Sequence, residues 1–396
     1  MRQGVAALRQ TILVFFLYQT LLDVRAMNIP VKSSKLRIPD VSNSFRMPLT
    51  ETVEVISPLH LSNYPSCVPP LTSSPGDVVL YIPGFDCTLV SPFMQFPELS
   101  SAFKASVYGI KISPDDRTTL STLSSVVGNY IMELLECDDV TGLYLIGESF
   151  GSLLLLSLLG SLFPSPHSSK LKGVTLVNPA TSYHRSLLKS TLDFLLSTPS
   201  WCYPILLPLT LPLFVDKFQI PSLALIVSSQ YLPSTLLKPE REAYMGRVAM
   251  GLGSMLEYMG KDTMRWRANQ WLDKADSVKF TGIEGLKFLL VSGSEDRALP
   301  STEECKRLEK ELKGEGNEVV RHLVLGSGHG GTMGSRVNIA QVMKGAFEGE
   351  GEKGVVWGEP EGIAMGMVGR KELREDMRKG MPPWRYFDAE VYKEYR

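Results

Sequence analysis

The sequence predicts an α/β fold, namely a mostly parallel sheet flanked by helices, with an apolar helical cap inserted into it. From Asp77 onward, short apolar runs rich in β-branched residues alternate with helical patterns, which is typical of βαβ units. Roughly a hundred residues separate Pro179 from Leu286, far more than an ordinary connection needs. The regular alternation predicts the sheet, and the long interruption predicts the cap.

The individual elements follow from local patterns in chain order. Strands are expected at residues 78–82, 106–112, 143–147, 173–179, 286–293 and 319–325. Helices are expected at residues 119–135, 150–162 and 301–312, where apolar side chains recur at helical spacing. A helical stretch rich in Met, Tyr and Trp is also expected within the insertion, at residues 240–271.

The chain divides into four expected parts. Residues 1–26 carry Arg2 and Arg9, an apolar stretch and a small-residue cleavage pattern, which is typical of a signal peptide. Residues 27–48 are serine-rich, basic and poor in acidic residues, so they form either a transit-like segment or a disordered stalk. Residues 49–348 form the α/β domain, with the cap insertion at about 183–283, and residues 349–396 form a polar C-terminal tail. The two leading segments together favour a plastid reached through the secretory route, with an endomembrane or secreted location as the alternative.

The overall composition excludes several classes of protein. A hydrophobic fraction of 44% and a charged fraction of 21% are globular values, and a formal net charge of −1 gives no support for nucleic-acid binding. The five cysteines are scattered, so neither a disulfide framework nor a zinc site is expected. We expect no cofactor and no metal.

The sequence Gly147-Glu148-Ser149-Phe150-Gly151 fits Gly-x-Ser-x-Gly, the nucleophile elbow of α/β-hydrolases. In that elbow the serine occupies a strained turn between a strand and a helix. The motif alone is weak, but here it joins an expected strand to an expected helix within a run of parallel strands. It therefore predicts an α/β-hydrolase fold with Ser149 as nucleophile.

A serine nucleophile needs a base and an acid that orients the base, and in this fold they follow in the order Ser, Asp or Glu, His. His329 lies in a glycine-rich loop after the last expected strand, whereas His322 lies within that strand and fits a structural role. Asp296 follows the penultimate strand, and its neighbour Glu295 fits a solvated loop charge. The predicted triad is Ser149, Asp296 and His329.

An oxyanion that forms during acyl transfer requires two aimed backbone N–H groups. Phe150, directly after the serine, is expected to supply one of them, and Phe85 in the loop "PGFDCT" after the first strong strand is expected to supply the other. A Pro-Gly pair after a strand also fits a plain turn.

Five segments together resemble the esterase/lipase/thioesterase half of the plastid phytyl ester synthases, a family of diacylglycerol acyltransferase-like enzymes. The segments are "LYIPGFDCTLVSP", "ISPDDRTTLSTLSSVVGNYI", "LYLIGESFGSLLLL", "VTLVNPATSY" and "VSGSEDRALPS". The resemblance implies formation of fatty acid phytyl esters and triacylglycerol in plastids, with Ser149, Asp296 and His329 as the triad. Cys87 stands where that family usually has glycine, and no His-x-x-x-x-Asp motif of its acyltransferase-like half is present.

These patterns predict serine-dependent acyl transfer from a lipid acyl donor to a fatty alcohol, phytol or diacylglycerol. A plain lipid esterase or lipase is the alternative, because hydrolysis and transfer differ only in the acceptor. A non-catalytic lipid-binding protein is a third interpretation, which the complete triad in order disfavours.

The insertion contains the segment at residues 200–215, which is apolar and interrupted by Pro204, Pro208 and Pro212, so one continuous helix is not expected. Its large side chains either pack on the sheet or form an apolar lid and acyl tunnel that faces a membrane or lipid-droplet surface. They are Trp201, Tyr203, Ile205, Leu206, Leu207, Leu209, Leu211 and Phe214.

Overall fold

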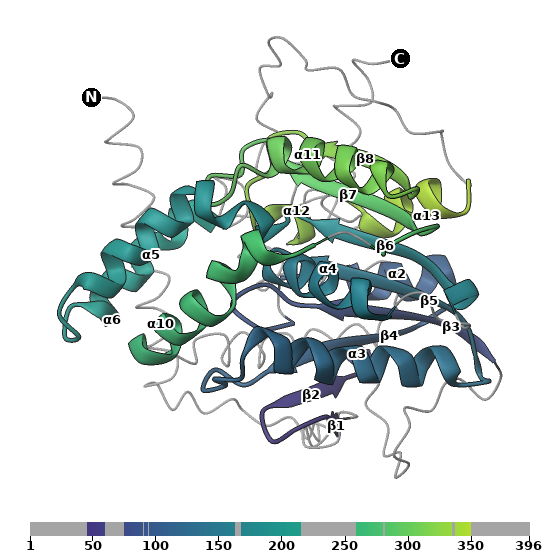
Figure 1. Cartoon of the computed structure of the whole chain (residues 1–396), viewed down its shortest axis with the longest axis horizontal. Coiled ribbons are helices and arrows are strands. Elements are labelled where there is room, and N and C mark those ends of the chain that lie inside the picture. Colours follow the sequence, from purple (N-terminus) through teal and green to yellow (C-terminus); the bar gives the residue numbers. More distant parts are fainter. Residues whose placement is uncertain are drawn as a thin grey trace, which may run out of the picture.

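A computed structural model of the chain describes residues 46–59, 75–89, 91–93, 95–162, 168–214, 259–279, 282–334 and 337–349. Several sequence predictions lie outside these ranges: the signal-like segment, most of residues 27–48, nearly all of the C-terminal tail, and residues 240–258 of the expected helical stretch. The described elements surround one central sheet (Figure 1).

The sheet has eight strands in the order β1-β2-β4-β3-β5-β6-β7-β8. Strands β3 to β8 are mutually parallel, and β2 runs antiparallel to both β1 and β4. The strands are β1 (Arg46–Pro48), β2 (Val53–Ile56), β3 (Gly76–Ile82), β4 (Ser106–Ile112), β5 (Val140–Glu148), β6 (Leu171–Val177), β7 (Lys287–Gly293) and β8 (Glu318–Val324). All six expected strands are confirmed, with ends that differ by at most three residues.

Helices cover both faces of the sheet (Figure 1). One face packs against α3 (Leu120–Glu136), α4 (Phe150–Leu162) and α11 (Ser301–Gly314), which confirms the three expected helices. The other face packs against α2 (Gln95–Phe103) and α13 (Ile339–Phe347). Because both faces are covered, the parallel strands are almost continuously apolar, as in "VVLYI" of β3.

Two strands at one side of the sheet, the edge strand β1 and its neighbour β2, are not among the strands expected from the sequence. Residues 46–48, assigned above to the transit-like segment, instead form β1, in which Arg46 is paired with Ile56. Residues 46–48 therefore belong to the α/β domain, ahead of its expected start at residue 49. In β2, Val53 and Val55 are buried while Glu54 and Ile56 are only half-buried, which is the alternation typical of an antiparallel strand with one face toward water.

The chain reverses its winding direction around β3. It leaves β3 through α2 to reach β4 on one side, and then crosses the opposite face through α3 to reach β5 on the other side. In open α/β sheets, ligands bind beyond the carboxyl ends of the strands at such a reversal. The loops that follow β3 and β5 are therefore the expected location of a site.

The insertion between β6 and β7 extends away from the sheet, to the left in Figure 1. Its described elements are η3 (Ala180–Arg185), α5 (Leu187–Ser197), α6 (Tyr203–Leu206), η4 (Leu207–Thr210), α7 (Leu211–Phe214), α10 (Lys261–Gln270) and η5 (Leu272–Ser277). The proline-punctuated segment is split into three short helices, as its sequence predicts. In the described part of the chain, no helix has the length and apolar character needed to cross a membrane.

The side chains of that segment divide into two groups. Tyr203 is fully buried, and Leu206, Leu207 and Phe214 pack against the core. Other large apolar side chains of the cap are at least half exposed, and we call this set the apolar cap face. Its members are Leu187, Phe194, Trp201, Ile205 and Leu209.

Candidate active site

Ser149 lies at the junction of β5 and α4 with a positive φ of 52°, a strained conformation for a residue other than glycine. Its N–H donates to the carbonyl of Val177 at 2.8 Å. The two motif glycines are required by close approach, because a Cβ on Gly147 would lie 2.6 Å from the Gly151 carbonyl oxygen. A Cβ on Gly151 would lie 2.2 Å from the Ile82 carbonyl oxygen, so the end of β3 packs directly against the elbow.

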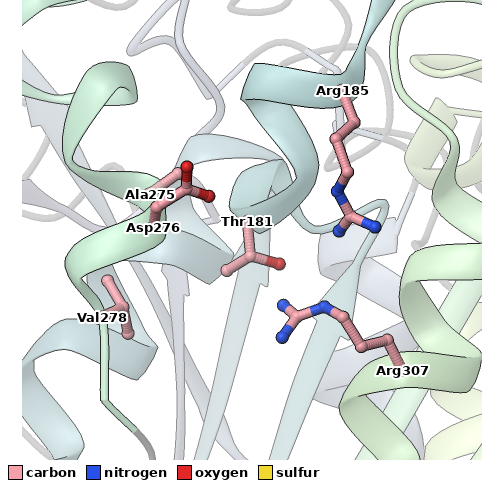
Figure 2. Close-up of a pocket in the computed structure, with 6 residues that line it drawn as sticks. All are labelled: Thr181, Arg185, Ala275, Asp276, Val278 and Arg307. Carbon is pink, nitrogen blue, oxygen red and sulfur yellow. The ribbon is translucent and has the colours of Figure 1, made fainter.

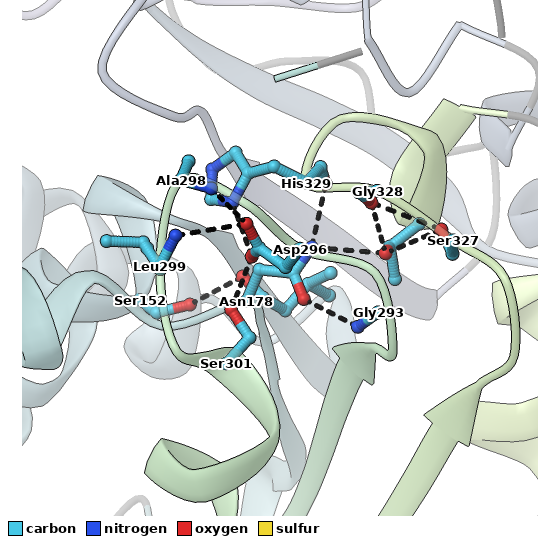
Figure 3. A network of polar contacts seen from close by, with 12 residues as sticks. Ser152, Asn178, Gly293, Asp296, Ala298, Leu299, Ser301, Ser327, Gly328 and His329 are labelled. Carbon is cyan, nitrogen blue, oxygen red and sulfur yellow. Dashed lines mark hydrogen bonds and ion pairs between the residues drawn. The ribbon is translucent and has the colours of Figure 1, made fainter. Parts of the chain in front are cut away.

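The structure brings the predicted acid and base together. His329 Nδ1 lies 2.7 Å from Asp296 Oδ2, and the side chains of both residues are buried (Figure 3). The second oxygen of Asp296 accepts the N–H groups of Ala298 and Leu299 at 2.9 and 3.0 Å. Ser301 Oγ also donates to the carboxylate, so the acid is held in one orientation by the turn that follows β7.

Asn178 joins the loops that carry the acid and the base. It lies at the end of β6 with φ +45°, a conformation that asparagine tolerates better than most residues. Its side-chain amide donates to the His329 carbonyl at 2.7 Å, and its Oδ1 accepts the Gly293 N–H at 2.9 Å (Figure 3). Asn178 is the asparagine of the "NPATS" sequence, and its side chain fixes the His329 loop against the end of β7.

The electrostatics around His329 favour its protonated form. Burial alone would lower the pKa of His329, but the nearby Asp296 and Glu148 carboxylates outweigh it and raise that pKa above its ordinary value. Glu148 precedes the nucleophile and is itself buried, and burial raises its pKa to about 7. Tyr81 and Ser91 donate their hydroxyl hydrogens to the Glu148 carboxylate. Three carboxylates, those of Asp296, Glu148 and Asp86, therefore raise the pKa of the base.

The expected oxyanion residues both lie beside the nucleophile. Phe150 is the first residue of α4, so its N–H has no partner within the helix. A Cβ on Gly84 would lie 3.6 Å from Ser149 Cβ, which places the loop containing Phe85 against the elbow. Cys87 closes that loop, because its N–H donates to the Gly84 carbonyl at 2.9 Å and its φ is +61°.

The two competing candidates are placed elsewhere. His322 lies within β8, paired with Val291, and burial lowers its pKa to about 4. Glu295 is exposed on the loop after β7. Neither is joined to the Asp296–His329 pair by a hydrogen bond.

The cap reaches the predicted base directly. Phe214 ends α7, and its ring lies edge-on to the His329 imidazole, with 5.9 Å between ring centroids. The Gly330 N–H donates to the Phe214 carbonyl at 2.8 Å. The proline-rich segment therefore forms one wall beside His329.

A separate cavity of about 190 Å³ lies between the base of the cap and α11 (Figure 2). Arg185 and Arg307 converge there on the buried carboxylate of Glu304 at 2.6 and 2.5 Å. Burial opposes ionisation of Glu304, but hydrogen bonds from Arg307 and Thr181 outweigh it and keep the Glu304 pKa below its usual value. The charges are paired with one another, so the cluster braces η3 against α11. Within the described ranges, no group of three or more His, Cys, Asp or Glu side chains is arranged to hold a metal ion.

The strand order, the reversal at β3 and the serine elbow decide the fold family. The fold is that of the α/β-hydrolases. Of the three predicted triad residues, the structure joins Asp296 to His329 by a hydrogen bond, and no hydrogen bond joins Ser149 Oγ to His329 among the described residues.

Over part of its length the chain is similar to a plant protein. The chain is 26% identical over 249 residues to phytyl ester synthase 1 of Arabidopsis thaliana, a chloroplastic protein. This match covers 62% of the chain but only 34% of the relative, so the chain spans about a third of that protein. No protein-family model matches the chain.

Solved structures of similar shape include two bacterial hydrolases. One is 2-hydroxy-6-oxo-6-phenylhexa-2,4-dienoate hydrolase from Rhodococcus sp. strain RHA1, 13% identical with a TM-score of 0.48. The other is a serine hydrolase from Cycloclasticus zankles, 10% identical with a TM-score of 0.47. In each case 77% of this chain and 98% of the other are covered. The fold assignment rests on the strand order and the elbow.

Sequence reasoning missed several residues of this site. Glu148 was visible only as a variable position of the elbow motif, and Asn178 only as part of a family-like segment. Each of these polar residues comes directly at the end of an apolar strand. A polar side chain that is buried there needs hydrogen-bond partners, and this was the signal available in the sequence.

Proposed function

We propose that the protein transfers an acyl group from a lipid acyl donor to an alcohol, such as phytol or diacylglycerol, through an acyl-enzyme on Ser149. The observation that carries the proposal is the strained serine elbow together with the buried Asp296–His329 pair, on which Glu148, the residue before the serine, acts through its charge. Phe85, Phe150, Asp296 and His329 take the roles described next.

In the first half-reaction Ser149 Oγ bonds to the acyl carbon while His329 Nε2 takes the serine proton. Asp296, hydrogen-bonded to Nδ1, stabilises the imidazolium that results. The Phe85 and Phe150 N–H groups donate to the oxyanion. The bond from the acyl carbon to the leaving group then breaks, and the leaving group takes the proton from His329.

In the second half-reaction an acceptor hydroxyl gives its proton to His329 and bonds to the acyl carbon. The bond to Ser149 Oγ breaks, and the serine recovers its proton from His329. Water in place of the alcohol would give hydrolysis instead. Exclusion of water by the apolar cap, which touches His329 through Phe214, favours transfer to the alcohol.

Two observations support a lipid substrate. The apolar cap face exposes five large side chains, and exposed apolar patches often mark membrane or partner contacts. The similar plant protein is a phytyl ester synthase, and its chloroplast location supports a plastid for this chain. We therefore infer that the cap contacts a membrane or a lipid-droplet surface while the acyl chain enters.

Two measurements test the proposal. A fluorophosphonate probe should label the wild type and should not label Ser149→Ala, whereas Ser197→Ala, on the exposed end of α5, should label normally. Incubation with a lipid acyl donor, with and without phytol, should give phytyl ester as the main product. Absence of labelling would rule out a serine acyl-enzyme, and free fatty acid at the same rate in both incubations would assign plain hydrolysis.

A further inference from the structure

The rings of both predicted oxyanion residues, Phe85 and Phe150, contact one side chain of the cap. Trp271, directly after α10, is fully buried. Its indole stacks on the Phe150 ring with centroids 4.6 Å apart and 14° between planes. The Phe85 ring meets the same indole edge-on at 6.3 Å. The two residues expected to donate to the oxyanion lie after β3 and after β5, yet they share a support from the insertion.

A buried arginine of α10 contacts the same indole. Arg267 is fully buried, and its guanidinium lies 4.5 Å from the centre of the Trp271 ring. The guanidinium donates to the carbonyls of Ser113 and Asp116, and Nη1 donates to Cys87 Sγ at 3.2 Å. No carboxylate of the described residues forms an ion pair with Arg267; its direct partners are carbonyl and sulfur atoms, and the Asp86 carboxylate interacts with its charge from further away. Burying a charge in this way is expensive unless the contacts are specific.

Cys87 connects Arg267 to the oxyanion loop. Its thiol lies between the guanidinium and the Phe85 carbonyl, donating to that carbonyl at 3.5 Å. Burial raises the Cys87 pKa to about 12, so the thiol stays protonated and keeps this donor. The chain of contacts therefore runs from α10 through Cys87 to Phe85.

The segment "SPDDRT" at residues 113–118 receives the cap. Besides accepting Arg267, it accepts the Trp271 indole N–H at the Thr118 carbonyl, 2.8 Å away. Arg117 in turn donates to Thr263 of α10 at 3.2 Å. This loop before α3 thus fixes α10 in the position from which Arg267 and Trp271 reach the oxyanion residues.

We propose that Arg267 and Trp271 are positioning residues that hold the oxyanion hole in its reactive geometry from the cap. The inference rests on the proposed function, because it assumes an oxyanion formed at Ser149. It adds that the cap does more than shield the substrate: with α10 out of place, the Phe85 and Phe150 N–H groups lose their common support. Misplaced donors weaken transition-state binding more than substrate binding.

The test compares Trp271→Leu and Arg267→Met with matched neighbours on the same helix, Trp266→Leu and Arg265→Met. Trp266 donates to the same Thr118 carbonyl at 3.4 Å, and Arg265 is exposed, but neither contacts the oxyanion residues. Active sites are first counted by exhaustive fluorophosphonate labelling. Turnover of a short p-nitrophenyl ester is then expressed per labelled site, so that unfolded protein does not contribute.

Loss of one oxyanion donor lowers kcat by about 10²–10³-fold. Misplacement without loss should lower kcat per site by about 10–100-fold in Trp271→Leu and Arg267→Met, with KM changed by less than about threefold. Trp271→Phe keeps a ring against Phe150 and should recover most of the turnover. The two neighbour variants should stay within about twofold of the wild type.

The proposal would be overturned if Trp271→Leu kept the kcat per labelled site of the wild type. It would also be overturned if Trp266→Leu lost as much kcat per site as Trp271→Leu. A rise in KM at unchanged kcat would assign the pair to substrate binding instead, which also overturns it. If Trp271→Leu does not fold, Arg267→Met decides by the same criterion, because methionine keeps the apolar stem. Failure of the wild type to label would refute the acyl-enzyme itself and is distinct from all of these results.

Discussion

At the scale of single residues, the protonation of His329 governs the proposed reaction. The base must be neutral to take the Ser149 proton, and the neighbouring carboxylates raise its pKa above the ordinary value of about 6.5. A group with a raised pKa loses its proton only at higher pH. We therefore expect kcat/KM for a short ester to rise with pH, with the midpoint of this acid limb above about 6.5. A midpoint below that value would mean that burial outweighs the carboxylates of Asp296, Glu148 and Asp86.

Asp296→Asn tests the origin of this shift. It should lower turnover by about 10³–10⁴-fold, because the imidazole loses control of its tautomer. It should also move the acid limb to lower pH, because the largest favourable charge beside the imidazolium is gone. Glu295→Gln is the matched control, since Glu295 is adjacent but exposed, and it should change neither quantity. Equal losses in both variants would assign the effect to the loop and not to one carboxylate.

The sequence identifies residues whose place depends on element order, and misses those that depend on distant contacts. Asp296 and His329 follow the ends of β7 and β8, so the order of strands was enough to find them. Arg267 meets Cys87 across 180 positions of the chain, and Asn178 meets His329 across 151. No local pattern encodes such contacts, because packing alone decides which side chains fill the space beside the serine.

At the scale of elements, burial on both faces made the parallel strands easy to predict. The apolar run of β3 is short, contains β-branched residues and ends at Pro83-Gly84, which together favour a strand over a buried helix. In contrast, β2 has only four residues and one covered face. Helix α2 was missed because Pro97 lies in its first turn, where proline is tolerated although it reads as a helix breaker. Short strands near the side of a sheet, and helices with proline in the first turn, are stabilised by contacts with neighbouring elements. The local sequence does not specify these contacts.

The first two strands allow a truncation prediction. A chain starting at Arg46 keeps β1 and β2 and should match the full chain in specific activity on a short ester. A chain starting at Ser57 loses both strands, uncovers β4 and removes the buried Val53 and Val55 side chains. Each such valine contributes about 1.5 kcal/mol or more, and an uncovered edge promotes aggregation. Its melting temperature should therefore fall by at least about 5 °C.

The activity of the Arg46 chain decides what the first 45 residues do. Equal specific activity in detergent would mean that the leading segment is dispensable for catalysis, as expected of an address. Loss of activity in a chain that melts normally would make that segment part of the enzyme. An unchanged melting temperature in the Ser57 chain would show that β1 and β2 contribute little to stability.

At the scale of the whole molecule, the balance of charges bears on how a lipid surface would be bound. The chain carries 41 Lys and Arg residues against 42 Asp and Glu residues, so it offers no excess of positive charge to an anionic membrane. The apolar cap face, in contrast, exposes Trp201 by 74% and Ile205 by 64%. Apolar burial, and not charge, is then the expected source of any affinity for lipid.

Vesicle binding separates these two sources. Binding to phosphatidylcholine vesicles should change by less than about twofold when salt rises from about 0.1 M to 1 M, although the Debye length falls from about 10 to 3 Å.

Replacing Trp201, Ile205 and Leu209 together by serine should weaken vesicle binding by about 100-fold, since each of the three side chains, partly buried in the lipid, contributes about 1 kcal/mol. Lys189→Gln with Arg265→Gln, which removes two cap cations, is the control and should bind normally. Because all three replaced residues are at least half exposed, the serine variant should keep its melting temperature and its turnover of a short soluble ester. Binding that salt abolishes, or that the control variant loses, would replace the apolar contact with an electrostatic one.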